Sequence, residues 1–305
     1  MRVLLIHNPK AGYEQADGPR LMELIHAAGH EPVYQSSEVD DLGAAMEQGV
    51  DLVAVAGGDG TVTRVLKRAV GLRTPLAILP LGTANNVANA IGHAGTLEHL
   101  IQGWASATPR PMDLGVVEAE WGQARFAESF GVGFLAETIV QTDKGDAERA
   151  RTKFKSVTER LNATVKSLRK SLQNLKPRPL RARTSAGVLE GEFLWAEAST
   201  VGLVGARLPL TDAADVSDGL LTFAALPADE RETFLEYLDH RLAGSAPTRT
   251  GFISERVAEI ELEWDGFHTH LDGSLVSDLF DGFTTRARIS TIPAAASVLR
   301  FARPG

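Results

Sequence analysis

Two glycine-rich turns each directly follow an apolar run that is typical of a buried strand. They are Gly57-Gly58-Asp59-Gly60-Thr61 and Pro80-Leu81-Gly82-Thr83-Ala84-Asn85-Asn86. Glycine lets the backbone bend with positive φ and approach a ligand closely, and a helix that starts there presents unpaired N–H groups to an anion. Turns of this kind bind phosphate, so two of them in one chain indicate a nucleotide.

The strands that would position these turns lie in the first hundred residues, where short apolar runs alternate with helix-length stretches. The predicted strands are Val3–His7, Pro32–Gln35, Leu52–Ala56 and Leu76–Leu79, and the predicted helices are Pro19–Ala28, Val39–Glu47 and Thr61–Val70. This alternation predicts an α/β domain with a parallel sheet, which binds its ligands at the carboxyl ends of the strands. Both glycine turns fall at that edge, as does Asn8-Pro9-Lys10-Ala11-Gly12 after the first strand.

After about residue 110 the pattern is mainly that of strands. The predicted strands are Asp113–Ala119, Ala124–Phe130, Phe193–Thr200, Leu220–Ala225, Val257–Trp264, Thr269–Leu271 and Thr285–Ile292. A basic helix and a helix over Glu230–Leu242 interrupt them. We therefore expect two domains with the active cleft between them. Residues 1–110 form the nucleotide-binding α/β domain, on which the tail from about residue 294 to 305 packs back, and residues 111–293 form a β-rich, mainly antiparallel domain.

Composition narrows the class of protein. The chain has no cysteine, which excludes disulfides, zinc–thiolate sites and thiol nucleophiles and fits a reducing compartment. The N-terminal apolar run Val3–Ile6 is shorter than the roughly 7–15 residues of a signal-peptide core. The longest stretch without Asp, Glu, Lys or Arg, Thr74–Leu97, is interrupted by proline and asparagine and is not typical of a membrane span. We expect a cytoplasmic protein, with peripheral contact to a membrane as the alternative.

One segment is basic although the whole chain has a formal net charge of −8. Residues 144–183 hold 13 Lys and Arg against 3 Asp and Glu. Their apolar residues recur every three or four positions, which places them on one helical face. The basic helix, residues 149–183, either contacts an anionic membrane, where each basic residue contributes about 1 kcal/mol, or packs its apolar stripe on the core and leaves a solvated charged face. We expect no nucleic-acid partner, because the segment offers no series of aromatic side chains to stack on bases.

Several short motifs occur in an order that resembles the diacylglycerol kinase catalytic-domain family, which includes bacterial diacylglycerol kinases and the sphingosine and ceramide kinases. The three loops described above carry the resemblance. Four later motifs support it: Met112-Asp113-Leu114-Gly115, Gly131-Val132-Gly133-Phe134, Asp215-Val216-Ser217-Asp218-Gly219-Leu220 and Leu271-Asp272-Gly273.

The resemblance implies ATP-dependent phosphorylation of a lipid hydroxyl, with diacylglycerol or a sphingoid-like lipid as substrate and with ATP and Mg²⁺ as cofactors. It places the nucleotide against Asn8, Pro9, Lys10, Ala11, Gly12, Ser37, Gly57, Gly58, Asp59, Gly60, Thr61, Val62, Thr63 and Thr83. It also implies a structural magnesium site made by Asp215, Asp218 and the carbonyl of Leu220. Oxygen ligands suit such a hard cation, but Ser-Asp-Gly is also common in turns that bind no metal.

The chain departs from the family pattern at three places, and each departure removes an acid. Thr63-Arg64 stand where the family usually has Asn-Glu, and Asn85-Asn86 stand where it has Asn-Asp. Ser274 takes the place of the glutamate in the late Asp-Gly-Glu motif, which is the presumed proton acceptor. A lost base costs about 10²–10⁴-fold in rate. Two residues remain as catalytic candidates: Asp59, the base in the sphingosine kinase branch, and Asp272.

Other interpretations stay open at the sequence level. A homologue that binds nucleotide or lipid without transferring phosphate would also fit the three lost acids. An NAD kinase would share the Gly-Gly-Asp-Gly-Thr loop but not the Pro-Leu-Gly-Thr-Ala-Asn loop. His268, His270 and Asp272 could ligate a metal, but residues i and i+2 of a strand share a face without one. A dimer is plausible.

Overall fold

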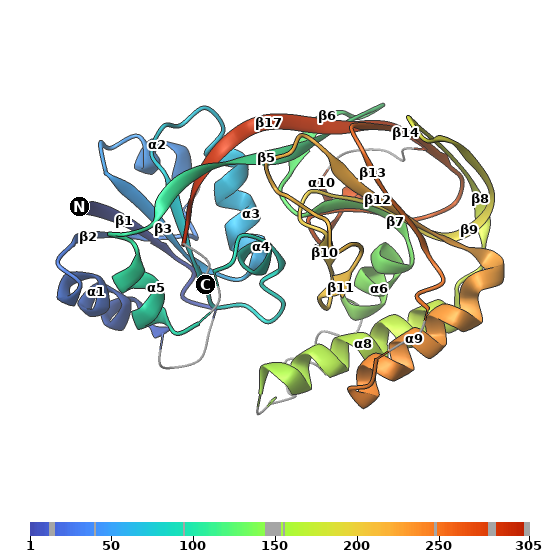
Figure 1. Ribbon diagram of the computed structural model, residues 1–305, viewed down its shortest axis with the longest axis horizontal. Helices are drawn as coiled ribbons and strands as arrows, with labels where there is room; N and C mark the ends of the chain where they lie inside the picture. The colour runs from blue at the N-terminus through green and yellow to red at the C-terminus, as the bar shows by residue number, and fades with distance from the viewer. Residues whose placement is uncertain are drawn as a thin grey trace. The chain divides into compact units, whose positions relative to one another are not determined.

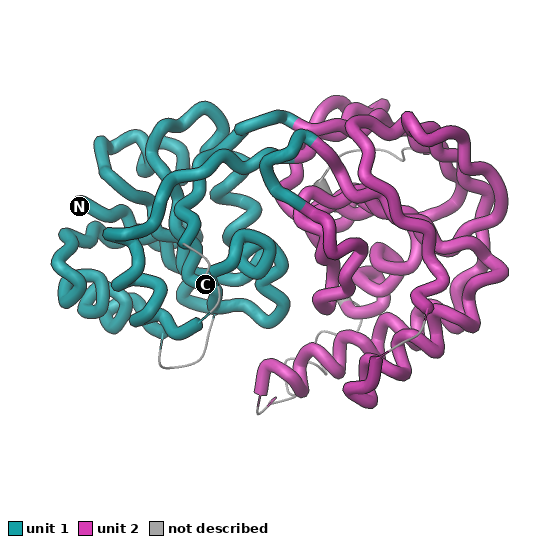
Figure 2. Tube along the Cα trace, in the orientation of Figure 1, with its two compact units in different colours: residues 1–114, 215–219, 292–305 teal, residues 115–214, 220–291 magenta. Residues whose placement is uncertain are grey.

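A computed structural model describes residues 1–11, 16–39, 41–93, 95–143, 154, 156–246, 249–279 and 285–301. The chain divides into two compact units (Figure 2). Unit 1 comprises Met1–Leu114, Asp215–Gly219 and Ile292–Gly305, and unit 2 comprises Gly115–Ala214 and Leu220–Thr291. Strand β5 (Thr108–Ala119) therefore contributes to both units, and the predicted boundary between residues 110 and 111 falls inside it.

Unit 1 is an α/β domain, as predicted (Figure 1). Its parallel sheet has the order β2-β1-β3-β4, and the end of β17 (Arg286–Arg300) adds to β4 where Val298 pairs with Leu76. The strands are β1 (Arg2–His7), β2 (Glu31–Ser36), β3 (Leu52–Gly57) and β4 (Leu76–Pro80). The helices are α1 (Gly18–Ala27), α2 (Leu42–Met46), α3 (Asp59–Arg68), α4 (Asn86–Ala90) and α5 (Leu97–Gly103).

Burial explains why these strands were easy to predict. Every residue of β3 is buried, as expected for a central parallel strand with both faces covered. The helix predicted over Val39–Glu47 is shorter than expected, because Asp41 caps α2 by accepting the amide of Ala44 at 2.9 Å. A side-chain cap of this kind fixes the first turn of a helix.

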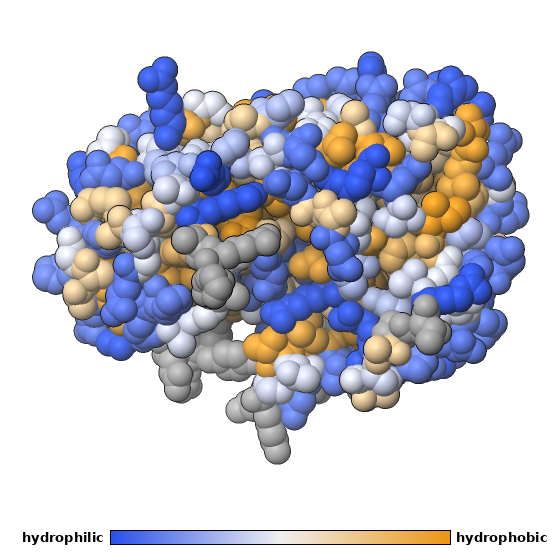
Figure 3. All heavy atoms as spheres, viewed as in Figure 1, coloured by the Kyte–Doolittle hydropathy of each residue, from blue (hydrophilic) through white to orange (hydrophobic). Residues whose placement is uncertain are grey.

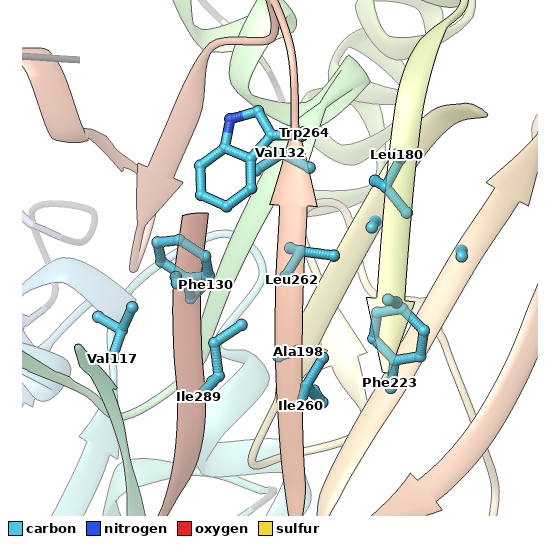
Figure 4. Packing of buried hydrophobic residues seen from close by; sticks show 14 of the residues in the cluster. Val117, Phe130, Val132, Leu180, Ala198, Phe223, Ile260, Leu262, Trp264 and Ile289 are labelled. Atoms are coloured by element: carbon cyan, nitrogen blue, oxygen red, sulfur yellow. The ribbon is translucent and has the colours of Figure 1, made fainter. Parts of the chain in front are cut away.

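Unit 2 is β-rich and antiparallel, with the strand order β16-β15-β7-β9-β8-β14-β17. Its further strands are β6 (Gly122–Phe126), β7 (Ser129–Gly133), β8 (Arg178–Thr184), β9 (Gly187–Ser199), β10 (Leu203–Val204), β11 (Leu208–Pro209), β12 (Leu221–Pro227), β13 (Ile253–Val257), β14 (Glu259–Trp264), β15 (Thr269–Leu271) and β16 (Ser274–Leu275). Its described helices are α6 (Phe134–Asp143), α8 (Val157–Asn174), η2 (Ala228–Glu230), α9 (Arg231–Ala243) and α10 (Val276–Leu279). Figure 4 shows Phe130, Leu262 and Ile289 gathered in a core of this unit.

The single strand predicted over Ala124–Phe130 is two strands in the structure. Strand β6 pairs with β5, whereas β7 pairs with β9 and β15. The break lies at Ala127 and Glu128, whose amides donate to Oδ1 of Asp272 at 3.0 and 2.9 Å. Because these amides bind a side chain instead of a neighbouring strand, the ladder ends there.

The described part of the basic helix packs its apolar stripe on the core. Val165, Leu168 and Leu172 of α8 are buried in a cluster with Trp195 and Phe234. The predicted stripe is confirmed over these residues, whereas residues 149–153 and 155 lie outside the described part of the chain. Hydrophilic and hydrophobic residues are interspersed over the face seen in Figure 3. Among the described helices, none has the length and apolar character needed to cross a bilayer.

Candidate functional site

The loops after β1, β3 and β4 lie together in unit 1. The amide of Asn8 donates to the carbonyl of Ala56 at 2.9 Å, and Nδ2 of Asn8 donates to Oγ1 of Thr61 at 3.0 Å. The two glycine turns touch directly, because a Cβ added to Gly82 would lie 2.5 Å from Cα of Gly58. Only glycine fits at such a backbone contact. The three loops therefore form one surface at the carboxyl edge of the sheet.

The start of α3 supplies the amides that this surface can offer to an anion. Gly58 is the N-cap of α3 and provides no side-chain cap, and the amides of Thr61 and Val62 donate to its carbonyl at 3.0 and 3.1 Å. The amides before Thr61, as at the start of any α-helix, have no backbone acceptor within the helix, although the amide of Asp59 donates to its own carboxylate. Gly60 is exposed, and a Cβ added there would meet nothing within 4 Å. A helix end of this form attracts phosphate through its amides and its partial positive charge.

Other residues predicted to bind the nucleotide either contribute only backbone atoms to the loops or have side chains buried in the interior. The amide of Lys10 donates to Oδ1 of Asn8 at 3.0 Å and that of Ala11 to its carbonyl at 3.0 Å, so these two amides are used within the first loop. Val62 and Thr63 are each 2% exposed and face the interior. The remaining predicted positions lie in the loops themselves: Pro9 is exposed, Gly57 is buried at the end of β3, and Thr83 is half-buried after β4. Gly12 lies outside the described residues.

Asp59 joins the two glycine turns. Its Oδ1 accepts the amide of Val87 at 3.3 Å, and the amides of Asn85 and Asn86 also stabilise its charge. Asn85, at φ 50°, begins α4 without a side-chain cap, so Asp59 satisfies the first amides of that helix. Burial raises the pKa of Asp59 above its ordinary value, and these amides oppose the rise. A catalytic role for Asp59 stays a prediction.

The loop after β2 borders the site and is held by Arg64 of α3, a residue to which the sequence assigned no role. Ser37 is buried, and its amide donates to the carbonyl of His7 at 2.7 Å. The guanidinium of Arg64 on α3 donates to the carbonyl of Ser37 and, at 3.1 Å, to that of Val39. Nζ of Lys10 lies 2.6 Å from Oε1 of Glu38, which raises the pKa of Lys10. The sequence does single out Arg64, because it stands where the family usually has a glutamate.

The predicted magnesium loop folds around a second missed residue, Asp113. This buried carboxylate accepts the amide of Gly219 at 2.7 Å and that of Ala294 at 2.7 Å. Its signal in the sequence was an acid inside the apolar strand that contains Met112-Asp113-Leu114-Gly115.

The donors proposed for that magnesium ion are partly engaged already. Oδ1 of Asp215 accepts the amide and the hydroxyl of Ser217 at 3.0 and 2.8 Å, and Arg300 lies 3.7 Å away. The Ser217 hydroxyl is the main cause that lowers the pKa of Asp215. Asp218 is exposed and Leu220 half-buried. Within the described residues no three His, Cys, Asp or Glu side chains gather as metal ligands, and the magnesium assignment stays a prediction.

In unit 2, Asp272 and Gly273 form a two-residue turn between β15 and β16. Their φ angles are 49° and 77°, as in the type I′ turn that Asp-Gly favours in hairpins. Oδ1 of Asp272 accepts the amides of Ala127 and Glu128, and the Asp272 amide donates to the carbonyl of Ser129 at 2.8 Å. Ser274 is exposed just after the turn. Asp272 thus fixes the hairpin, and its catalytic role stays a prediction.

A buried acid–imidazole pair lies beside this hairpin. Oε2 of Glu197 accepts Nε1 of Trp195 at 2.9 Å and lies 3.2 Å from Nε2 of His270. Glu197 and His270 are 1% and 3% exposed. Gly131 makes room for them, since a Cβ there would lie 1.9 Å from Oε2 of Glu197. Burial alone would lower the pKa of His270, but the charge and hydrogen bond of Glu197, with the charge of Asp272, raise it.

This pair predicts a pH dependence of stability. A His pKa that is raised by folding adds stability that is complete below the unfolded pKa of about 6.5 and is lost as pH rises through the folded value. We expect the free energy of unfolding, measured by urea titration, to fall above about pH 6.5 by at most about 1.4 kcal/mol per pH unit. His270→Gln should flatten this decline, because it removes the imidazole whose pKa is raised. A decline that persists in His270→Gln contradicts the assignment.

Comparison with known proteins finds similarity to lipid kinases. Residues 2–117 match the family "Diacylglycerol kinase catalytic domain". A diacylglycerol kinase of Mycobacterium tuberculosis is 28% identical over 271 residues, which cover 85% of this chain and 80% of that protein. A "Probable lipid kinase YegS-like" of Pseudomonas aeruginosa is 28% identical over 319 residues, which cover 98% of this chain and 96% of that protein. The crystal structure of a diacylglycerol kinase from Bacillus anthracis superposes with a TM-score of 0.67 at 18% identity, covering 99% of this chain and 97% of that chain, and it shows the same fold.

Proposed function

We propose, from the match of residues 2–117 to the diacylglycerol kinase catalytic-domain family and from the similarity to bacterial lipid kinases, that the chain is an ATP-dependent lipid kinase of the cytoplasm. In this reaction the bond between the γ-phosphorus and the ADP oxygen breaks. A new bond forms to a lipid hydroxyl, of diacylglycerol or a sphingoid-like lipid, whose proton passes to a base. Phosphoryl transfer depends on positioning and on neutralisation of charge more than on covalent chemistry.

One observation carries the proposal: the exposed start of α3, where Gly58 and Gly82 touch. The amides there, with the ammonium of Lys10, would hold the phosphates. Magnesium, when bound, would neutralise part of the phosphate charge. The test is ligand protection. Millimolar ATP or ADP with magnesium should raise the midpoint of thermal unfolding, and the absence of any shift contradicts the proposal.

Gly60→Ala separates nucleotide binding from folding. The new Cβ meets no protein atom within 4 Å, and alanine inside a helix is more stable than glycine by about 0.5–1 kcal/mol. We therefore expect unfolding by urea to need equal or more denaturant, while calorimetry shows ADP affinity reduced about tenfold or more, because the methyl group stands where the phosphate approaches the amides. Unchanged ADP affinity would place the phosphate elsewhere.

A second candidate is a nucleotide- or lipid-binding homologue that transfers phosphate poorly. Two observations favour it: Ser274 stands at the position of the family base, and the Oδ1 atoms of Asp59 and Asp272 already accept backbone amides. Tight ADP binding without phosphorylation of diacylglycerol or sphingosine would select this candidate.

Peripheral contact with an anionic membrane is part of the proposal for the lipid kinase. Lys166 and Lys170 on α8 and Lys176 beyond it are exposed. Three arginines of the same segment are already paired: Arg169 with Asp239 at 2.6 Å, Arg181 with Glu190 at 3.2 Å and Arg183 with Glu261 at 3.8 Å. The exposed lysines, together with the exposed Arg178, would therefore supply positive charge to a membrane. Binding to phosphatidylglycerol vesicles that disappears at high salt would support the contact.

A further inference from the structure

Arg64 connects α3 to the loop after β2. Its Nη2 donates to two carbonyls of that loop, those of Ser37 and Val39. Arg64 is half-buried on α3, in the second turn after the glycines. One guanidinium on two carbonyls fixes both the position and the direction of a short loop, because its donors have a rigid planar geometry.

The residue between the two held carbonyls is Glu38. Its carboxylate lies 2.6 Å from the ammonium of Lys10, in the loop after β1. The amide of Glu38 is itself fixed by Oγ of Ser36 at 3.2 Å. The contacts thus run from Arg64 through the held loop to Glu38 and from there to Lys10. Lys10 is otherwise 82% exposed in its side chain, and a long exposed ammonium without a fixed partner has many conformers.

We propose that Arg64 is a positioning residue for Lys10. By holding residues 37–39, it directs Glu38 to keep the Lys10 ammonium near the loop surface where phosphate binds. This inference rests on the proposed function, because it assumes that the loop surface binds the phosphates of a nucleotide. In this proposal Arg64 acts through the position of Glu38, and the positive charge of Arg64 does not itself attract the phosphates.

The experiment measures ADP and inorganic tripolyphosphate affinity by calorimetry, with magnesium, for Arg64→Met, Glu38→Gln and the double variant. We expect each single variant to bind both ligands about tenfold more weakly, which is about 1.4 kcal/mol. The double variant should be no weaker than either single variant, because the two residues act in series. Arg68→Met on the same helix removes an equal charge from an exposed arginine and should change affinity by less than about twofold.

A Lys10→Met background separates positioning of Lys10 from a direct effect of the Arg64 charge. The loss caused by Arg64→Met should disappear in that background, because Arg64 acts through the Lys10 ammonium, and Arg64→Lys should recover part of the affinity by reaching the same carbonyls. Additive losses, an undiminished loss in the Lys10→Met background, or tighter binding in Glu38→Gln overturns the inference. If the wild-type chain binds neither ADP nor tripolyphosphate, the proposed function itself fails and the inference falls with it. Normal wild-type binding with an unaffected Arg64→Met overturns the inference alone.

Discussion

Replacing Ser274 by glutamate should raise the rate of diacylglycerol phosphorylation by about 10²-fold, the lower end of what a positioned base contributes. Ser274 is exposed immediately after the turn that Asp272 and Gly273 form. The bonds from Ala127 and Glu128 to Asp272 hold that turn. A longer side chain at position 274 therefore extends into solvent without disturbing the core, and in the proposed reaction its carboxylate would accept the proton of the lipid hydroxyl.

The control for this prediction is Ser274→Gln, which has nearly the shape of glutamate but no basic carboxylate. Initial rates with radiolabelled ATP and diacylglycerol micelles should rise in Ser274→Glu only. If neither variant changes the rate, Asp59→Asn decides between the remaining bases. That change keeps an oxygen for the amide of Val87 and removes basicity. Lost turnover with intact ADP affinity would then indicate Asp59 as the base.

The parallel sheet and its loops could be predicted because local patterns determine them. Strand β3 is apolar along its whole length and ends directly in Gly57-Gly58, so its position and the loop after it follow from the sequence. The sequence of Thr74–Leu97 indicates a strand, a loop and a helix, but the bounds of the short helix α4 could not be predicted. This helix has only five residues and takes its cap from Asp59, which is 27 residues away from Asn86. The sequence next to a helix cannot show that its cap is supplied by a residue of another loop.

Long-range contacts also explain the errors in unit 2. The predicted strand Val257–Trp264 begins with the last residue of β13, which pairs with β12, and continues into β14, which pairs with β8 and β17. An uninterrupted run of strand-forming residues cannot show that its partners change. Asp113 was noted only as part of a motif, because its acceptor role depends on Gly219 and Ala294, which are far away in the sequence.

Gly82→Ala should weaken ADP binding by about 10²-fold, because it separates the two glycine turns. The added Cβ would lie 2.5 Å from Cα of Gly58 and 2.7 Å from Oδ1 of Asn85. Neither atom can yield easily, since one is backbone and the other accepts the Gly82 amide at 2.9 Å. Overpacking of this kind costs about 1–3 kcal/mol of stability. A displacement of about 1 Å at a binding loop can cost about 10²-fold in function.

The measurements are ADP affinity by calorimetry and the free energy of unfolding by urea titration. Gly58→Ala supplies a milder variant, because its Cβ would lie 3.1 Å from Cα of Gly82, so affinity should decrease from the wild type through Gly58→Ala to Gly82→Ala. Gly43→Ala in α2 makes only an ordinary contact, 3.4 Å from Oδ1 of Asp41, and should bind ADP like the wild type. If Gly82→Ala does not fold, the milder Gly58→Ala variant still tests whether the phosphates bind where the two turns meet. Wild-type ADP affinity in both Gly58→Ala and Gly82→Ala would show that the phosphates do not bind where these turns meet.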